Sequence, residues 1–531
     1  MIRHTLIFLL FSNIVFGQNL KDTKINVSKK YNPSVTDANR LDDQAVFLDT
    51  INIKNTFDYD FINMQIKTKP NVRPLKPALV KNQKFLFNNL NKMELSLGNK
   101  FSSNVCLNFS KKIREKLIFG IVSSNDRIRY KIINDTHIKK NNFFFNAFAN
   151  SEIKTNDITT NFHFISSLNS TDQSITNANN EKSKFNFNHA VFDVKVKDKI
   201  LSRKSITHIT SLSYESLFSE INNYKSDENI LKFGSQLSAK IYQLDSYFDM
   251  TLADYRFGKY SSSDELVITI TPSVDVEIFS FDANFGIAFD YFQNEKIFDA
   301  FPIIKISKVL VPKISEVSFG TKNDYQRNYL INNYLINPLL YIDYTHIKNS
   351  ESKLIYLEFF NKLSKRQFIN IYSEFGYYEN FMNYENTVTA PNNTFEYNYT
   401  NLWQSSSTIK YSNMINHFTK LNFDLSYQYR TIQNLSHISD VHADLYSEIN
   451  LKNKIIVSPI INYQSPKKSF IGNSEYELEE IMNINIHSYY SLNNQIDFNI
   501  KLNNILNSKT EVFRNIKQIG FNISLGFNYK F

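Results

Sequence analysis

The chain has 531 residues, of which 42% are hydrophobic and 15% aromatic, and its formal net charge is +9. The mean hydropathy is negative, at -0.35, and no run of about twenty apolar residues follows the N-terminus, which argues against a helical membrane protein. Basic and acidic residues are interspersed, so no arm of the kind that binds nucleic acid is present. The sequence has no nucleophile elbow, phosphate loop, paired cysteines or HExxH motif. We therefore expect no enzyme activity, cofactor, metal site or nucleic-acid partner.

Residues 1–17 predict a secretory signal peptide. Arg3 and His4 form a basic start, an apolar core begins with 6–10, and the small residue Gly17 ends the segment at a plausible cleavage point. No cysteine stands there, so a lipid anchor is not expected. The segment predicts export of the chain.

Residues 18–90 differ in character from everything that follows. Four of the eleven prolines lie here, and proline is disfavoured inside sheets because it lacks a ladder donor. The stretch KPNVRPLKPALVKN predicts an extended, polyproline-like tether. We expect a periplasmic lead-in that is too short to be a full plug domain and that either reaches into a barrel lumen or engages a periplasmic partner.

From residue 91 to the end, apolar and polar residues alternate in one repeated pattern. The clearest example is 518–531, where the odd positions are Ile, Phe, Ile, Leu, Phe, Tyr and Phe and the even positions are polar or glycine. Side chains of a strand point alternately to two faces, and a strand that crosses a bilayer needs about nine to eleven residues. The stretch predicts a membrane-crossing closing strand; the alternative is a long strand of a soluble sheet. Residues 279–291, 421–430 and 495–502 show the same alternation.

The expected connections alternate in length. Tight turns are expected at 364–366, 413–417, 452–454 and 493–494, and longer connections at 380–400, 432–440, 464–480 and 507–517. Outer-membrane barrels have short periplasmic turns and longer extracellular loops, and with both chain ends in the periplasm the strand number must be even. At roughly twenty residues per strand and connection, 91–531 holds about 22 strands, within a range of about 20 to 24.

Only helices and closed sheets satisfy their backbone polar groups inside a bilayer, and an open sheet of this size would expose aggregation-prone edges. The fold predicted is thus all-β: a transmembrane antiparallel β-barrel in the cell outer membrane, with outer-membrane lipid around it. Aromatic residues near strand ends suit interfacial girdles, although their ordinary β-propensity explains them equally well. They are Tyr427, Tyr429, Tyr489, Tyr490 and Tyr529.

Several polar residues share the parity expected for the lumen. They are His442, Asp444, Glu448, His487, Asp497 and Lys501. They indicate a polar solute-binding or proton-sensitive wall; the alternative is a hydrated lumen whose polar residues satisfy one another. Two ligands at i and i+2, such as His442 and Asp444, are too few for a metal site. The Tyr- and Asn-rich stretch 380–400 is expected to be a loop that recognises an external ligand, folds into the mouth, or is simply solvated.

Three parts of the sequence carry a family resemblance. They are YNPSVTDANRLDDQAVFLDT with VRPLKPALV, then FSKKIREKLIFGIVSSNDRIR, and then DYQRNYLINNYLINPLL with the closing QIDFNIKLNNILN and QIGFNISLGFNYKF. Together they resemble the TonB-dependent-receptor-like outer-membrane barrels of Bacteroidetes. The resemblance implies a barrel without the plug of true TonB-dependent receptors, and it transfers no functional residue.

These expectations combine into one functional hypothesis. The chain is expected to mediate passage of a solute or a polypeptide across the outer membrane. The alternative is a non-transporting barrel subunit or surface receptor of an envelope complex, with a periplasmic or outer-membrane protein as its partner.

Overall fold

The computed structural model describes residues 91–133, 136–153, 156–171, 184–198, 206–221, 224–242, 244–258, 264–294, 296–328, 348–386, 395–432, 434–452, 454–472 and 474–531. The expected signal peptide and lead-in, residues 1–90, lie outside the described residues. No helix in the described ranges has the length and apolar character needed to cross a membrane.

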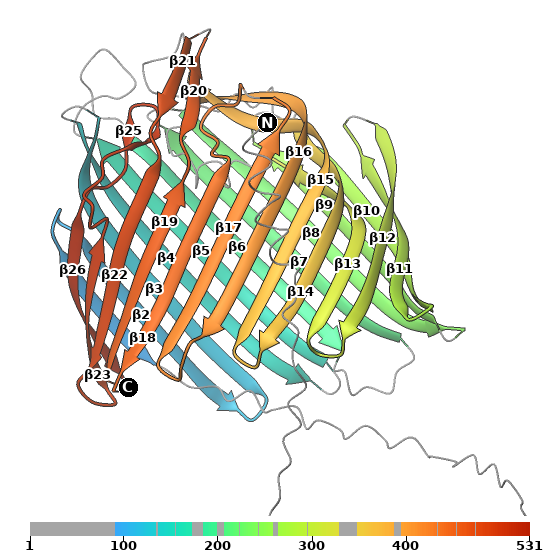
Figure 1. The fold of residues 1–531 in the computed structure, drawn as a ribbon, viewed down its shortest axis with the longest axis horizontal. Coiled ribbons are helices and arrows are strands. Elements are labelled where there is room, and N and C mark those ends of the chain that lie inside the picture. Colours follow the sequence, from blue (N-terminus) through green and yellow to red (C-terminus); the bar gives the residue numbers. More distant parts are fainter. Residues whose placement is uncertain are drawn as a thin grey trace, which may run out of the picture. The chain divides into compact units, whose positions relative to one another are not determined.

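Twenty-two strands form one antiparallel sheet in which each strand pairs with its neighbour in the sequence (Figure 1). The first half comprises β1 Lys92–Gly98, β2 Ser103–Arg114, β3 Leu117–Ile133, β4 Thr136–Ile153, β5 Asn156–Thr171, β6 Lys184–Asp198, β7 Ile206–Ile221, β8 Tyr224–Ile241, β9 Leu244–Phe257, β10 Glu265–Ile278 and β11 Phe281–Phe292. The second half comprises β12 Ile297–Val311, β13 Ser315–Arg327, β14 Asn349–Ser364, β15 Gln367–Asn386, β16 Phe395–Met414, β17 Thr419–Arg430, β18 Val441–Leu451, β19 Ile455–Gln464, β22 Ile481–Ser491, β23 Ile496–Asn503 and β26 Asn522–Lys530. Because β1 also pairs with β26, the sheet closes into a barrel, which confirms the predicted fold and strand number.

Two small hairpins stand outside the barrel sheet. They are β20 Lys467–Ile471 with β21 Ser474–Leu478, and β24 Glu511–Phe513 with β25 Ile516–Lys517. Both belong to the long connections predicted at 464–480 and 507–517. They lie at the same end of the barrel, opposite the C-terminus (Figure 1). We call this end the mouth.

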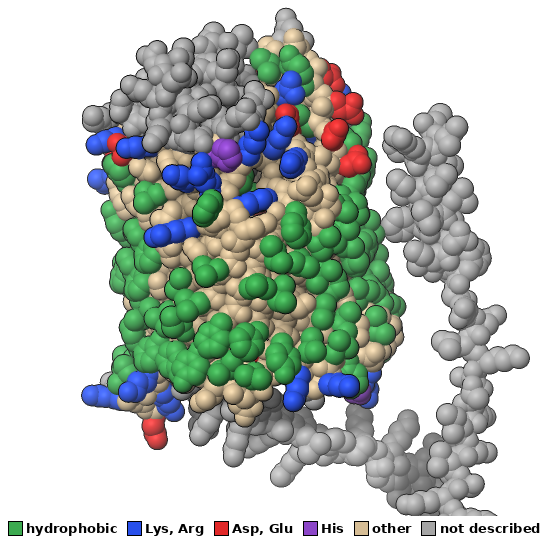
Figure 2. All heavy atoms as spheres, turned by 90° about the vertical axis from the view of Figure 1, so that its left-hand side faces the viewer, with side chains coloured by type: hydrophobic (Ala, Val, Ile, Leu, Met, Phe, Trp, Pro, Cys, Tyr) green, Lys and Arg blue, Asp and Glu red, His purple; other side chains and the backbone are tan. Residues whose placement is uncertain are grey.

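Side chains alternate between the two faces of the barrel wall as the sequence predicts. In β26, Leu525, Phe527 and Tyr529 are exposed on the outer face, whereas Asn528 is buried on the inner face. Figure 2 shows the resulting apolar surface on the side of the barrel that faces the viewer. The same parity holds in β17, where Tyr427 is exposed, and it fits a sheet solvated by lipid outside and lined by polar groups inside.

The closing strand is shorter than predicted: β26 begins at Asn522, not at residue 518. Side chains of the preceding connection and of the β1–β2 turn hydrogen-bond to the backbone of 520–521 instead. The Asn507 carboxamide oxygen accepts the Phe521 N–H at 2.9 Å, and the Lys100 ammonium donates to the Gly520 carbonyl at 2.7 Å. The apolar–polar alternation of the sequence therefore begins at residue 518, before the first hydrogen-bonded residue of β26.

Two other boundaries also differ. β11 begins at Phe281, since Phe279 and Ser280 adopt positive φ (48° and 67°) and form the hairpin turn before it. Part of the stretch 380–400 is strand: β15 runs to Asn386 and β16 starts at Phe395, with a register shift after Tyr378. Aromatic residues of these two strands pair across the sheet, and 387–394 lie outside the described residues.

The predicted tight turns are confirmed. Their end of the barrel is the one that holds the C-terminus (Figure 1). One aromatic prediction is wrong: Tyr489 is not a girdle residue. It pairs with Asn499, which is buried on the inner face, whereas its neighbour Tyr490 pairs with the outward Phe498. Two consecutive tyrosines cannot both face lipid in a strand.

A lumen-side ion pair reinforces the closure of the barrel. The Lys501 ammonium of β23 lies 2.8 Å from the Glu94 carboxylate of β1 and thus spans the intervening strand β26. Gly526 lies between the partners of Lys501 and Glu94 on β26 and leaves room for the Asn499 side chain, because a Cβ there would come within 2.5 Å of it. A second pair, Lys530 with Asp497 at 2.7 Å, joins β26 to β23.

Replacing Lys501 with Met is expected to lower the free energy of unfolding by about 1 to 3 kcal/mol, because it leaves a largely buried carboxylate without its close cation. Lys92 is the matched control: its ammonium lies 3.9 Å from Glu94 and its side chain is 38% exposed. Lys92→Met should change stability by less than about 0.5 kcal/mol. Urea unfolding of the detergent-folded barrel measures both. Equal losses of stability would contradict a stabilising role for the Lys501–Glu94 ion pair.

Candidate functional site

All six lumen candidates from the sequence lie on the inner face of the wall. His442 and Asp444 pair with Ser426 and Asp424 of β17, on the face opposite the outward Tyr427. His487 pairs with Lys501, which shares the parity of the buried Asn499. The candidates do not converge on one point, because they occupy the wall from the mouth end of β18 to the turn end of β23.

Most of these residues have protein partners. Asp444 accepts from the Asn462 amide at 2.6 Å, Glu448 accepts from the Tyr446 hydroxyl at 3.1 Å, and the His487 Nε2 lies 3.0 Å from the Asn503 carboxamide oxygen. Asp497 and Lys501 belong to the two ion pairs, with Lys530 and with Glu94, that join β23 to β26 and to β1. Five of the six candidates therefore pair with neighbouring wall residues, although one carboxylate oxygen of Asp497 is buried without a hydrogen bond among the described residues. Only His442, at the mouth end, adjoins groups of a different kind.

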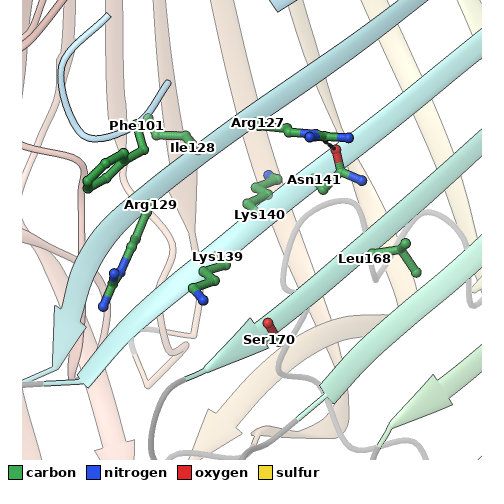
Figure 3. Close-up of a pocket in the computed structure, with 9 residues that line it drawn as sticks. All are labelled: Phe101, Arg127, Ile128, Arg129, Lys139, Lys140, Asn141, Leu168 and Ser170. Atoms are coloured by element: carbon green, nitrogen blue, oxygen red, sulfur yellow. Dashed lines mark hydrogen bonds between the residues drawn. The ribbon is translucent and has the colours of Figure 1, made fainter. Parts of the chain in front are cut away.

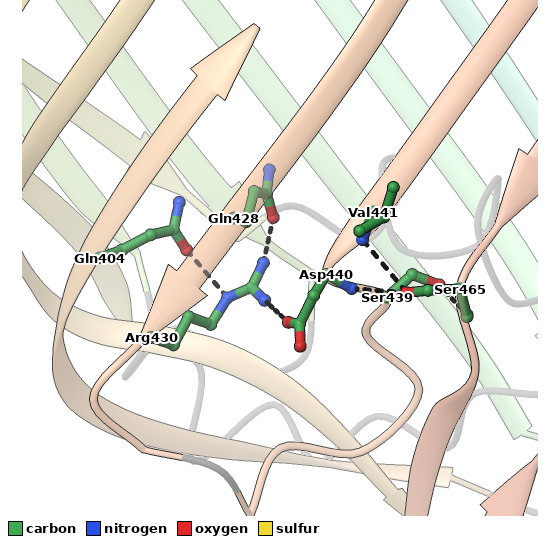
Figure 4. Close-up of polar contacts among 7 residues, drawn as sticks. All are labelled: Gln404, Gln428, Arg430, Ser439, Asp440, Val441 and Ser465. Carbon is green, nitrogen blue, oxygen red and sulfur yellow. Dashed lines mark hydrogen bonds and ion pairs between the residues drawn. The ribbon is translucent and has the colours of Figure 1, made fainter. Parts of the chain in front are cut away.

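The first of these groups is Arg430, at the mouth end of β17. Its buried guanidinium points toward Gln404 of β16, Gln428 of β17 and Asp440 of the 431–440 connection (Figure 4). Nε donates to the Gln404 side-chain oxygen at 2.9 Å, and one terminal nitrogen pairs with the Asp440 carboxylate at 3.1 Å. A planar guanidinium with three fixed acceptors is a rigid positive charge at the mouth.

The second group is Lys467, the first residue of β20. It is only 8% exposed, and burial lowers the pKa of Lys467 to about 8. In the part of the chain that the structure describes, no residue is hydrogen-bonded or ion-paired to its ammonium. Its charge acts on both His437 and His442. A buried lysine side chain without a counter-ion among the described residues is a candidate site for an anion.

We call Arg430, His442 and Lys467 the mouth cluster. The sequence pointed to His442 but not to the other two. Arg430 stands on the polar face of the alternating stretch 421–430, which predicts its inward direction but not its three acceptors. Lys467 follows Pro466 in a long connection without alternation, so nothing local reveals its direction. A buried, unpartnered lysine is a property of tertiary packing and leaves no local signal.

Connections from four parts of the chain pack together at the mouth, and we call this packed region the lid. It comprises the mouth ends of β15 and β16, residues 434–440, β20–β21 and β24–β25. Phe395 at its centre is 0% exposed, with its ring centroid 5.4 Å from those of both His437 and Phe513. The Ser436 hydroxyl accepts the Phe470 N–H at 3.0 Å.

His437 joins three of these segments through one imidazole. Nδ1 lies 3.2 Å from the Tyr384 carbonyl oxygen, which can only accept, so Nδ1 carries the proton. Nε2 accepts the Arg514 backbone N–H at 3.3 Å. Burial, together with the nearby charge of Lys467, lowers the pKa of His437 to about 4 despite the hydrogen bond to Tyr384. The neutral ring is thus a structural part of the lid.

The inner face near the mouth is more apolar than the sequence parity predicts. Leu217, Ile230 and Phe257 point inward and are almost fully buried, and they belong to the same hydrophobic cluster as Tyr384 and Phe395. Apolar packing therefore occupies this part of the inner face, beside the polar residues that the sequence placed there.

Further polar networks line the inner face on other strands. Glu215 accepts from Lys232 at 2.7 Å and lies 3.7 Å from the His189 ring, and Lys322 pairs with Glu374 at 3.2 Å. Within the described ranges, no group of three or more His, Cys, Asp or Glu side chains is arranged to hold a metal ion.

No family model and no curated protein matches this sequence. Solved structures do resemble it. A point mutant of the ferric enterobactin receptor PfeA from Pseudomonas aeruginosa gives a TM-score of 0.62 at 9% identity over 83% of this chain and 80% of its own. The chain has the barrel fold of siderophore receptors. The ferric-catecholate import receptor Fiu of E. coli K12 gives 0.63 at 11% identity, covering 84% and 82%, and the siderophore receptor PirA of Acinetobacter baumannii gives 0.63 at 10%, covering 83% and 80%. At these identities the likeness concerns the fold, and these neighbours are receptors rather than enzymes.

The lid is expected to loosen as the pH falls. The pKa of His437 in the folded lid, about 4, is below the ordinary value of about 6.5, so its contribution is complete above pH 6.5 and is lost between about 6.5 and 4, up to about 3 kcal/mol. Protonation removes the acceptor for Arg514 and adds a charge beside Lys467. Hydrogen exchange of 434–440 and 511–516, corrected for intrinsic rates, should rise over this range.

His437→Gln is the matched control for this effect. A glutamine can donate to Tyr384 and accept from Arg514 but does not titrate. The variant should therefore show exchange that is independent of pH between 6.5 and 4. The same rise in both proteins, or none in the wild type, would contradict the role of His437.

Proposed function

We propose that the chain is an outer-membrane barrel that takes up an anionic solute through its mouth. The observation that carries the proposal is Lys467, a buried ammonium that has no partner among the described residues. Retaining such a charge costs free energy unless an anion compensates it. Arg430 and His442 place two further nitrogen-bearing side chains at the same end of the inner wall.

The names of proteins with a similar fold support an anionic solute. They include receptors named for ferric enterobactin and for ferric catecholates, and a catecholate is by its chemistry an anion. For this chain we propose an anionic chelate or a similarly charged small solute. The lid then serves as the element that encloses the solute after it reaches the mouth cluster.

Residues 18–90 are the remaining part of the proposal. A barrel of 22 strands encloses a lumen wide enough to leak unless something fills it. We propose that export depends on the signal peptide 1–17 and that the lead-in segment either occupies the lumen or recruits a periplasmic partner. It would then take the place of the plug domain that true TonB-dependent receptors have and that this chain is expected to lack.

The alternative, a non-transporting subunit of an envelope complex, draws its support from the lid. Its packed aromatic centre, with Phe395 fully buried, is the kind of structure expected where the mouth stays shut. Under this alternative the mouth cluster would bind no free solute, so binding and conductance measurements separate the two proposals.

Replacing Lys467 with Met is expected to weaken binding of the ferric tris-catecholate complex about tenfold, the loss expected for one charge-assisted hydrogen bond. Lys468 is the matched control, since it is adjacent but half-exposed and paired with Glu475 at 2.7 Å. Lys468→Met should bind as the wild type does. Equilibrium dialysis with the purified folded protein measures both. Equal affinities for wild type and Lys467→Met would reject the mouth cluster as the site.

Deleting residues 20–85 is expected to convert a barrel with little steady conductance into one that conducts in planar bilayers and that admits large antibiotics in cells, because the lumen loses its filling. The folded state of the deleted protein is checked by its resistance to SDS before heating. A stable, deleted barrel with unchanged conductance and permeability would count against plugging and in favour of the non-transporting alternative.

A further inference from the structure

Toward the mouth, the side chains on the outer face of β3 and β4 change from apolar to polar and basic. Along β4 the outward residues are Phe143 and Phe145 in the apolar band, followed by Asn141 and then Lys139. On β3 the partners of these last two are Arg127 and Arg129. Figure 2 shows Lys and Arg side chains gathered above the apolar band on this side of the barrel. Cations thus border the apolar band on its mouth side.

These residues border a hollow of about 530 Å³ that also includes Phe101 and Leu168 (Figure 3). We call Phe101, Arg127, Arg129, Lys139, Asn141 and Leu168 the outer basic patch. It combines cationic groups with two exposed apolar side chains on one surface. A site for free phosphate would need only the cations.

Phe101 is held in an unusual way. It lies in the β1–β2 turn with φ of 52°, a left-handed conformation that costs a bulky residue free energy, and its side chain is 83% exposed. The Arg129 N–H donates to the Lys100 carbonyl at 2.9 Å, which docks the turn onto β3. The turn therefore presents an exposed aromatic ring beside Arg129, and no packing within the described chain accounts for it.

Two of the cations are available for an added anion. Arg127 donates from Nε to the Asn141 carboxamide oxygen at 3.1 Å, which fixes the guanidinium (Figure 3). Within the described ranges, neither Arg127 nor Lys139 is ion-paired to a carboxylate. A fixed guanidinium with free terminal nitrogens matches a phosphate group, and a neighbouring ammonium adds a second contact.

We propose that the outer basic patch binds the phosphorylated head group of a lipid in the leaflet around the mouth, with its acyl chains against Phe101 and Leu168. Cations at a membrane surface attract anionic head groups, and apolar side chains at the same depth contact the chains. This inference rests on the proposed membrane placement of the barrel. It does not depend on solute uptake, because the patch is on the outside and the mouth cluster is on the inside.

The test uses the full chain, folded in detergent, with dioctanoyl phosphatidic acid as the probe and native mass spectrometry as the readout. The wild type should bind phosphatidic acid at least about tenfold more tightly than dioctanoyl phosphatidylcholine, and added salt should weaken this preference. The double variant Arg127→Gln with Lys139→Gln should lose the preference. Phe101→Ser should weaken binding of the lipid while leaving its phosphate selectivity intact.

Lys111→Gln is the matched control, because Lys111 is exposed on the same outer side of β2 but near the opposite end of the barrel. It should bind as the wild type does. Inorganic phosphate that competes with the lipid at equal concentration would overturn the proposal in favour of a simple anion site. Unchanged preference in the double variant would overturn the patch itself. Failure of the wild type to float with liposomes would instead reject the membrane placement.

Discussion

The structure depends on one constraint, which is that every strand must find a hydrogen-bonded neighbour on both sides. Inside a bilayer no water replaces a missing partner, so a sheet of 22 strands has to close. The ladder between β1 and β26 achieves this, and Lys501 and Glu94 reinforce it from the lumen across Gly526. The two-residue period of the strands then divides the surface: once the outer face is apolar, the inner face must carry the polar residues.

That division also explains where function can reside. In mid-wall, polar side chains such as Asp444 and Asn462 satisfy one another and leave little to recognise a ligand. At the mouth the regular ladder gives way to the lid, whose packing buries Lys467 without a counter-ion among the described residues and Arg430 with three acceptors. On the outside, Arg127 and Lys139 lie within β3 and β4, on the mouth side of the apolar band. Both proposed sites therefore lie toward the mouth end of the barrel.

The sequence was sufficient for the fold because alternation is a local property. Residues 518–531 revealed the parity of β26, and the same reading placed His442, Asp497 and Lys501 on the inner face. It failed where tertiary contacts override the local pattern: Ile519 and Phe521 alternate but lie outside the strand, and 381–386 and 395–400 are paired strands where a loop was expected. Lys467 and His437 could not be found this way, since their burial arises from four segments that are distant in the sequence.

Closure by β1 and β26 is the claim on which the rest depends, and a disulfide tests it most directly. Hydrogen bonds from Phe531 to Asn91 and from Asn99 to Ile523 make Glu94 and Asn528 a non-hydrogen-bonded pair, with Cα atoms about 4.5 Å apart and suited to a disulfide. In a Cys106→Ser background, Glu94→Cys with Asn528→Cys should form the bond on oxidation, so that fragments cut in a mouth loop stay joined until reduced. Leu95→Cys with Asn528→Cys, on opposite faces, should not. No bond in the first pair, or equal bonds in both, would contradict the closed barrel.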